Sequence, residues 1–334
     1  MKRLLVVLIA LSLFACSEKS PTSPGKKANP SSYKYEIAFE RHSDTDYSIN
    51  DKIWIVNIET GQFRNVTPNQ DIYEANPKDW NKLTGEIYWF DYPTKRIMAA
   101  KDDGSSFRQI SSELSCPDDT HPRQSCLSIS YDCQYVLYSN EFGIAIVKTD
   151  GSSYKLLDGR PVRGARFSPK SNNIAAVVDT VADNTIKTKL YIMDLSGKTL
   201  NTFFNSNKSW PELTIWASGF PVWSPDGKKI IQAFIINLST SQILPLPAVA
   251  NEYSWTPDSD KIVFSDYEND DICTINIDGT DRKILYDYGS RPQYSPDGAY
   301  LAFTTTGGLA VMDSKNNVKI LDRIYGPPYL WRPI

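Results

Sequence analysis

The stretch WSPDGKKI, residues 223–230, decides the fold of this chain because variants of it recur along most of the sequence. Each variant has an aromatic or apolar residue, a turn related to Ser-Pro-Asp-Gly, and a new apolar run directly after the turn. The aligned copies start at Trp80, Ile129, Phe167, Trp223, Trp255, Tyr294 and Trp331. Successive copies lie 32 to 56 residues apart. This spacing predicts roughly one four-stranded propeller blade per copy.

A second series of turns supports the same count. Asp and Asn bond their own backbone in a turn and Gly supplies positive φ, so clusters of these residues between apolar runs indicate hairpins. Seven such clusters occur, namely NIETG (57–61), KDDGS (101–105), KTDGS (148–152), MDLSG (193–197), NLSTS (237–241), NIDGT (276–280) and MDSKN (312–316). The two series together predict an all-β fold, a seven-bladed β-propeller.

The two ends of the chain complete each other. In a blade, strands a to d run from the innermost to the outermost. Apolar runs near 35–41, 52–58 and 62–67 have no strand a before them, and the strand a near 329–331 has nothing after it. We therefore expect the C-terminal strand to pair with the N-terminal blade, which removes the exposed strand edges. The region 220–246 is short, and the sequence leaves open whether blade five has three or four strands, or whether 212–218 supplies one.

Three copies, WSPDGKKI, WTPDSDKI (255–262) and YSPDGAYL (294–301), resemble the WD40-like repeats of the TolB-type β-propeller family. The resemblance extends over nearly all of residues 35–334 and implies a propeller fold and a cell-envelope setting. This chain departs from TolB itself because it has no separate N-terminal α/β domain and counts seven blades instead of six. Membership of a Tol–Pal-like complex is therefore not expected.

The N-terminus has the features of an export signal. Lys2 and Arg3 precede an apolar run over 4–14, which is too short to span a bilayer as a helix. The ending LFAC (13–16) resembles a bacterial lipoprotein box and predicts lipidation at Cys16; the alternative is an ordinary secretory signal. We expect a signal peptide at 1–15, a flexible Ser- and Pro-rich tether at 16–33 and the propeller at 34–334. The protein would be exported and lipid-anchored to the envelope, at the outer membrane if the cell is diderm.

The charge of the chain excludes one class of partner. The formal net charge is −3 and basic residues do not cluster beyond the first three residues, so nucleic acid is not an expected partner.

Cys116 and Cys126 lie in one loop and are a candidate disulfide. Cys133 is placed at the far end of the strand that starts at Cys126, out of bonding range. Cys133 and Cys273 are interpreted as small buried hydrophobes.

Catalytic and metal-binding patterns are weak. The chain has two histidines, and the sequence contains none of GxSxG, HExxH, GxGxxG or a P-loop. We therefore predict no enzymatic activity and no cofactor. Loop carboxylates are weak metal candidates, and solvated loop charge is the favoured interpretation. These candidates are Asp44, Asp46, Asp270 and Asp271.

The propeller topology assigns binding to one rim. The a–b and c–d turns lie on one rim, here called the turn rim, and the b–c and d–a connections lie on the other, the loop rim. Variable loops such as 111–126 and 204–219 belong to the loop rim, where binding residues are expected. The candidate binding-face residues are Tyr73, Arg163, Trp210, Trp216, Tyr267, Tyr288, Arg291 and Tyr325. The predicted partner is an envelope protein; the alternative is a polysaccharide bound or cleaved by a carbohydrate-active propeller.

Overall fold

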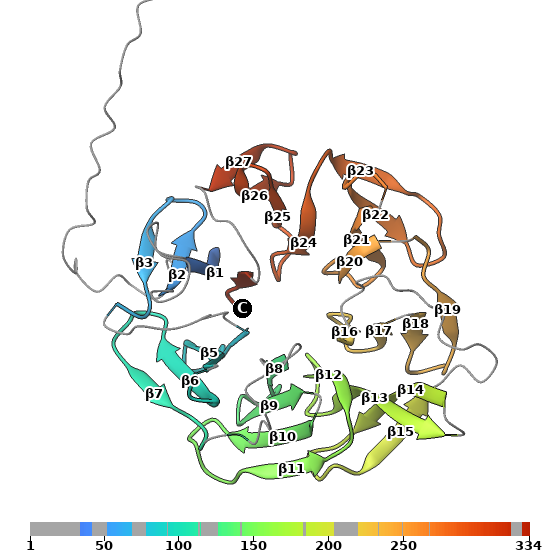
Figure 1. Cartoon of the computed structure of the whole chain (residues 1–334). Coiled ribbons are helices and arrows are strands. Elements are labelled where there is room, and N and C mark those ends of the chain that lie inside the picture. Colours follow the sequence, from blue (N-terminus) through green and yellow to red (C-terminus); the bar gives the residue numbers. More distant parts are fainter. Residues whose placement is uncertain are drawn as a thin grey trace, which may run out of the picture. The chain divides into compact units, whose positions relative to one another are not determined.

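The computed structural model describes residues 34–41, 52–68, 78–91, 93–112, 114, 126–140, 142–182, 185–203, 220–232, 234–248, 250–266, 268–321 and 329–334. These lie in one compact unit, Lys34–Ile334. Seven antiparallel sheets of four strands form a ring, as Figure 1 shows. The predicted seven-bladed β-propeller is therefore confirmed. Among the described residues, no helix has the length and apolar character needed to cross a membrane.

The first four blades contain the following strands, given from a to d. Blade 1 is β28 (Tyr329–Trp331), β1 (Glu36–Arg41), β2 (Lys52–Asn57) and β3 (Phe63–Asn65). Blade 2 is β4 (Asp79–Trp80), β5 (Glu86–Asp91), β6 (Arg96–Lys101) and β7 (Phe107–Gln109). Blade 3 is β8 (Cys126–Ile129), β9 (Tyr135–Asn140), β10 (Gly143–Lys148) and β11 (Lys155–Asp158). Blade 4 is β12 (Val162–Phe167), β13 (Ile174–Ala182), β14 (Thr185–Met193) and β15 (Thr199–Phe203).

The remaining three blades follow the same order. Blade 5 is β16 (Val222–Trp223), β17 (Lys229–Ile231), β18 (Phe234–Asn237) and β19 (Ile243–Pro245). Blade 6 is β20 (Ala250–Trp255), β21 (Lys261–Asp266), β22 (Ile272–Asn276) and β23 (Lys283–Tyr286). Blade 7 is β24 (Ser290–Tyr294), β25 (Tyr300–Thr305), β26 (Gly308–Asp313) and β27 (Val318–Leu321).

Blade 1 closes the ring with strands from both ends of the chain. The C-terminal β28 pairs antiparallel with β1, in the register Ile37↔Trp331, Ala38↔Leu330 and Phe39↔Tyr329. The main chain continues this contact, since the N–H of Arg332 donates to the carbonyl of Glu36 at 2.8 Å. The predicted closure by the C-terminal strand is confirmed.

The Ser-Pro-Asp-Gly turns are held by one repeated set of hydrogen bonds. In blade 5 the Ser224 hydroxyl donates to Asp226 Oδ1 at 2.6 Å and accepts from the N–H of Lys229 at 2.8 Å. Gly227 adopts φ +71°, the left-handed region that glycine enters without a steric penalty. The same Ser/Thr-to-Asp bond recurs in blades 6 and 7. The turn therefore needs a hydroxyl residue and an aspartate for its hydrogen bonds, and a glycine for its left-handed backbone.

The aromatic residue of the repeat explains how neighbouring blades join. Three indoles donate from Nε1 to a carbonyl on strand a of the preceding blade. These bonds are Trp223 to Arg166 at 3.2 Å, Trp255 to Val222 at 3.0 Å and Trp331 to Gln293 at 3.0 Å. The rings also pack in apolar clusters that span adjacent blades. An indole buries a large apolar area and still satisfies its N–H, which accounts for tryptophan at this position.

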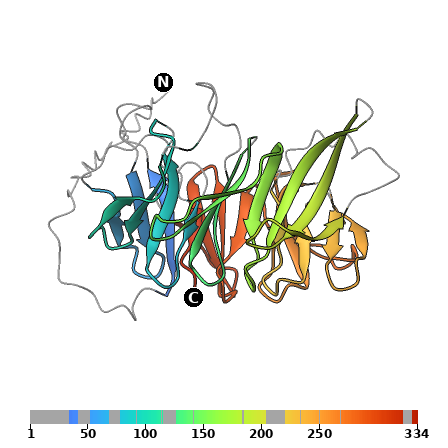
Figure 2. The ribbon, with the colours of Figure 1, turned by 90° about the horizontal axis from the view of Figure 1, so that it is seen from below.

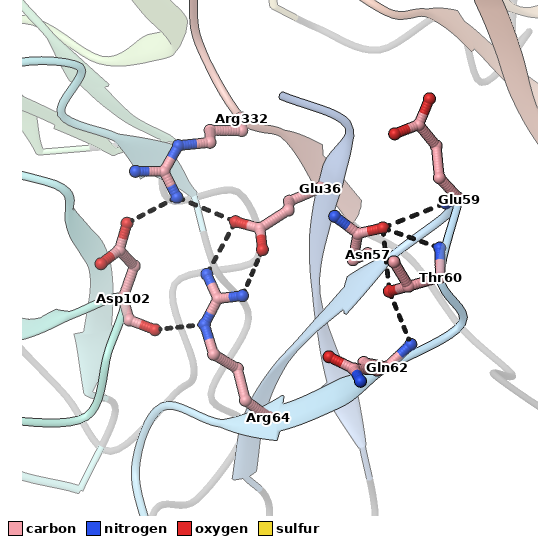
Figure 3. A network of polar contacts seen from close by, with 8 residues as sticks. All are labelled: Glu36, Asn57, Glu59, Thr60, Gln62, Arg64, Asp102 and Arg332. Atoms are coloured by element: carbon pink, nitrogen blue, oxygen red, sulfur yellow. Dashed lines mark hydrogen bonds and ion pairs between the residues drawn. The ribbon is translucent and has the colours of Figure 1, made fainter. Parts of the chain in front are cut away.

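A buried ion-pair network, drawn in Figure 3, fixes the closure at the turn rim. Glu36 is completely buried and accepts from both Arg64 and Arg332, whose Nη1 lies 2.8 Å from Glu36 Oε2. Arg332 also pairs with Asp102 at 2.8 Å, and Arg64 Nε donates to the Asp102 carbonyl at 2.8 Å. Burial raises the pKa of Asp102 although Arg332 and Arg64 lie beside it. The network joins blade 1 to blade 2.

The bond from Arg64 Nε to the Asp102 carbonyl belongs to a series of similar bonds, here called the outer-strand latches. A cation on strand d donates to a carbonyl in the c–d turn of the next blade. The latches are Arg64 to Asp102 and Arg108 to Thr149, both at 2.8 Å, Lys155 to Ser196 at 2.9 Å and Lys319 to Ile58 at 3.0 Å. Arg108 also forms a two-bond ion pair with Glu86, which matches the Arg64–Glu36 pair of blade 1. The latches join blades 7, 1, 2, 3 and 4 along the turn rim.

Blades 4 and 5 differ most in the length of their strands. β13 and β14 each contain nine residues, and Figure 2 shows their hairpin rising above its neighbours. The strands of blade 5 contain between two and four residues, and its b–c turn is closed by the Gln232 N–H donating to the Phe234 carbonyl. Blade 5 therefore has four short strands, which answers the question that the sequence left open. The alternative strand at 212–218 lies outside the described residues.

Candidate functional site

Three of the predicted binding-face residues can be placed. Arg163, Tyr288 and Arg291 lie at the loop rim, on strands a or in the d–a connection that leads into one. The rest of that set lies outside the described residues, namely Tyr73, Trp210, Trp216, Tyr267 and Tyr325. Cys16, Asp44, Asp46 and Cys116 also lie outside them. The described candidates gather mainly where blades 6 and 7 meet.

Tyr288 projects from the connection between β23 and β24. Its side chain is 74% exposed and its backbone is left-handed, with φ +59°. A non-glycine residue pays a steric penalty in this conformation, so the surrounding structure must hold it there. The next residue, Gly289, is buried, and a Cβ on it would lie 2.8 Å from Ile272 Cγ1. The connection is therefore pressed against blade 6 while the phenol points outward.

Hydrogen bonds from blade 6 fix this connection. The N–H of Gly289 donates to the Asp270 carbonyl at 2.6 Å, and the N–H of Tyr288 donates to Asp271 Oδ1 at 3.3 Å. The Ser265 hydroxyl donates to the Gly289 carbonyl at 3.1 Å. Asp270 and Asp271 thus hold Tyr288 in place. Across the described ranges, no three His, Cys, Asp or Glu side chains are grouped as a metal site.

The next feature is an ion pair across the start of two inner strands. Arg291, with φ +58°, donates from Nε to Glu252 Oε1 at 2.8 Å. The other oxygen, Glu252 Oε2, is inaccessible to solvent and has no hydrogen-bond partner among the described residues. The ladder of β24 is irregular between Ser290 and Gln293, and that of β20 between Ala250 and Glu252. Such bulges redirect side chains, and here they lie at the mouth of the ring.

Arg163 occupies the equivalent place in blade 4. The β12 ladder shifts register between Val162 and Gly164, so Arg163 is the inserted residue, and its side chain is exposed. Bulged starts of strand a in blades 4, 6 and 7 therefore carry Arg163, Glu252 and Arg291, three of the charged residues of the loop rim. The sequence named Arg163 and Arg291 from their place in the repeat. It missed Glu252, which only the pairing of blade 6 with blade 7 brings to Arg291.

Two further charged residues of the inner strands, Asp79 and Arg166, were also missed. Asp79 on β4 accepts the N–H of Ile129 on β8 at 2.7 Å and the N–H of Trp80 at 2.7 Å. Burial raises the pKa of Asp79 despite these bonds and the nearby Arg166 guanidinium. Both residues directly precede the aligned aromatic of their copy, where the other copies have Ser, Val, Gln or Leu. A charged residue directly before the aligned aromatic is the sequence signal that could have identified Asp79 and Arg166.

The cysteines are placed as follows. Cys126 and Cys273 are buried on β8 and β22, and burial raises the pKa of both thiols. Cys133 is buried too, but the expectation that it ends the strand of Cys126 is wrong. β8 ends at Ile129, and Cys133 lies in the following turn with φ +60°. The interpretation of Cys133 and Cys273 as buried apolar residues is confirmed, while the Cys116–Cys126 pair stays a prediction.

Comparison with known proteins identifies the fold. No protein-family model and no curated protein sequence matches this chain. Part of a puromycin hydrolase complexed with PGG is similar, with TM-score 0.62 and 11% identity over 88% of this chain and 53% of that one. The β-propeller domain of Cps50 (Swd1) from Myceliophteria thermophila gives 0.50 and 14%, over 76% and 87%. A TolB from Agrobacterium tumefaciens gives 0.48 and 17%, over 82% and 89%. At these identities the likeness concerns the propeller fold.

Proposed function

We propose that this protein is a protein-binding propeller of the cell envelope, with no catalytic activity of its own. Its recognition surface is the corner of the loop rim formed by Tyr288, Arg291 and Glu252. The exposed aromatic on a rigid connection carries this proposal. A tyrosine offers a large contact area at small entropic cost when its backbone is already fixed, and Tyr and Arg are enriched at the centres of interfaces.

The charges next to Tyr288 support a protein partner. Arg291 and Glu252 form an ion pair whose side chains are 40% and 33% exposed, so that a partner can contact both. A polar rim around an aromatic anchor is the usual composition of a protein interface. A carbohydrate also stacks on an exposed tyrosine, so a glycan partner is an outcome that the test below must separate.

The test is photo-crosslinking in the native cell. A benzoylphenylalanine in place of Tyr288 should crosslink a discrete protein on irradiation. The matched control places the same residue at Tyr131, which is 46% exposed but lies in the a–b turn of blade 3 on the turn rim. A protein adduct at position 288 and none at 131 supports the proposal. Adducts with polysaccharide, or no adduct at 288, would contradict it.

The cellular setting is part of the proposal. The export signal and the lipoprotein-like box ending at Cys16 favour a lipid anchor in the envelope. Metabolic labelling with an alkyne fatty acid should label the wild-type chain and leave Cys16→Ser unlabelled. A mature protein that starts at another residue and carries no lipid would remove the anchor, and the loop-rim proposal would then apply to a secreted protein.

A further inference from the structure

The hairpin of blade 4 extends beyond the rest of its sheet. β13 and β14 pair without interruption from Ile174↔Met193 to Ala182↔Thr185. The neighbouring strands are shorter: β12 reaches only Val178 on one side, and β15 reaches only Leu190 on the other. In the described part of blade 4, residues 179–182 of β13 and 185–188 of β14 therefore have no ladder partner on their outer sides. Figure 2 shows the two strands standing clear of the ring.

The two free edges are not equivalent. β14 contains Lys187 and Lys189 in this stretch, and lysines on an edge strand hinder pairing with another chain. β15 also runs along the lower part of β14, and the chain continues from Phe203 on that side. The stretch 178–182 of β13 reads Val-Asp-Thr-Val-Ala, with neither lysine nor proline, and is rich in residues that favour strands. Among the described residues, the β13 edge is thus the open one.

The position of this edge decides what it faces. In the sheet order β12-β13-β14-β15, the free side of β13 is the side on which β12 lies lower down. Within blade 4, β12 is the strand nearest the ring axis, as Figure 1 shows. A strand added to β13 at 179–182 would therefore stand above β12, at the mouth of the ring on the loop rim.

We propose that residues 179–182 of β13 bind an extended segment of a partner protein, which joins blade 4 as an added antiparallel or parallel strand. The proposal rests on the protein-binding role described above and specifies the form of the partner. Main-chain hydrogen bonds to a free edge are a common way of holding an extended peptide. A second copy of this chain is a poorer occupant, because a stable dimer buries about 1,200 Å² or more and four edge residues supply a small part of that.

The experiment uses extended peptides as the probe. Twelve-residue peptides are selected from a random phage-displayed library on the full chain, and their Kd is measured by fluorescence anisotropy. In the test variant, Asn-Gly replaces residues 179–188 and joins Val178 to Lys189, which already pair across the hairpin. The rest of the sheet keeps its register, and a two-residue Asn-Gly turn suits a hairpin. We expect the variant to bind the selected peptides at least tenfold more weakly.

Hydrogen exchange on the unmodified chain gives an independent readout. A bound peptide strand should slow exchange of backbone amides within 179–182, which binding through side chains alone would not do. Unchanged affinity in the shortened variant, absence of this protection, or a library that yields no binding peptide would each overturn the proposal. So would a dimer of the full chain that becomes monomeric on shortening, because the occupant would then be a second copy.

The two proposals fail separately. If a protein crosslinks at position 288 while peptides bind the shortened variant as well as the wild type, the loop-rim function stands and strand addition does not. If strand addition is observed without a protein adduct at 288, the partner binds blade 4 and the recognition corner of blades 6 and 7 is wrong.

Discussion

The turn rim and the loop rim are built from the same strands, yet their side chains serve different ends. On the turn rim, Ser224 and Asp226 close a turn within six residues, and outer-strand latches tie the c–d turns of blades 1 to 4 to the blade before each. On the loop rim, Tyr288 and Arg291 hold left-handed backbone conformations at bulged or bent strand starts. Polar groups in the turns of the first rim bond to one another, whereas on the second rim Tyr288 is 74% exposed and Glu252 Oε2 has no hydrogen-bond partner among the described residues. The difference separates residues that stabilise the ring from residues that we propose contact a partner.

The largest predicted effect is on the turn rim. Glu36→Ala should lower the free energy of unfolding by about 3 kcal/mol, because Arg64 and Arg332 lose the buried carboxylate that both contact. Urea unfolding followed by tryptophan fluorescence measures it. Glu36→Gln is the control, as it keeps the side-chain volume and should lose less. A change below about 0.5 kcal/mol would show that the closure does not depend on this network.

The second prediction concerns the loop rim. Tyr288→Gly should weaken binding of the crosslinked partner about thirtyfold, or about 2 kcal/mol, the loss typical of an interface anchor. Its stability should stay unchanged or rise slightly, because glycine adopts φ +59° without strain. Isothermal titration and thermal melting measure the two quantities. Tyr131→Ala on the turn rim should leave binding unchanged, although it removes the contact of its ring with Lys82 Nζ, 4.6 Å from the ring centroid, and so lowers the melting temperature slightly. A loss of binding there would remove the contrast between the rims.

A smaller effect is expected from a single turn. Ser224→Ala should cost about 1 kcal/mol, since it removes the hydroxyl that the Lys229 N–H and Asp226 both use. Ser241→Ala, in the c–d turn of the same blade, should change the free energy of unfolding by under about 0.5 kcal/mol because Ser241 is exposed. Equal losses at the two serines would mean that the repeated turn has no special role in stability.

The smallest effect is a pH dependence at the turn of blade 7. Partial burial opposes the charge on Asp297, but the N–H of Ala299 together with Lys34, Tyr35 and Ser295 outweighs it and lowers the pKa to about 2. A carboxyl with a lowered folded-state pKa stabilises the fold above its ordinary value of 3.8 and stops doing so as pH falls through 2. Wild type and Asp297→Asn should therefore differ by under about 1 kcal/mol near neutral pH and converge near pH 2. A constant difference from pH 7 to pH 2 would contradict this.

The candidate site was predicted only in part, and the reason is physical. Repeat position placed Tyr288 and Arg291 on the loop rim, because the side of a blade on which a connection falls follows from strand order alone. Glu252 lies 39 residues before Arg291, and the register shifts that bring them together leave no local mark in the sequence. The left-handed backbone of Tyr288 depends on Asp270 and Asp271, which belong to a different hairpin connection.

The sequence by itself determined the seven blades and their closure, because turn chemistry and apolar periodicity act within a few residues and repeat along the chain. Tertiary structure decided the rest. In blade 5 the two-residue β16 pairs with β17, and its Trp223 also donates to the Arg166 carbonyl of blade 4, a contact between blades that the sequence does not reveal. Among the described residues, the outer side of β13 is free beyond Val178 because its neighbour β12 pairs only as far as that residue. Strand length is set by which neighbour is present to pair, and that is a property of the assembled ring.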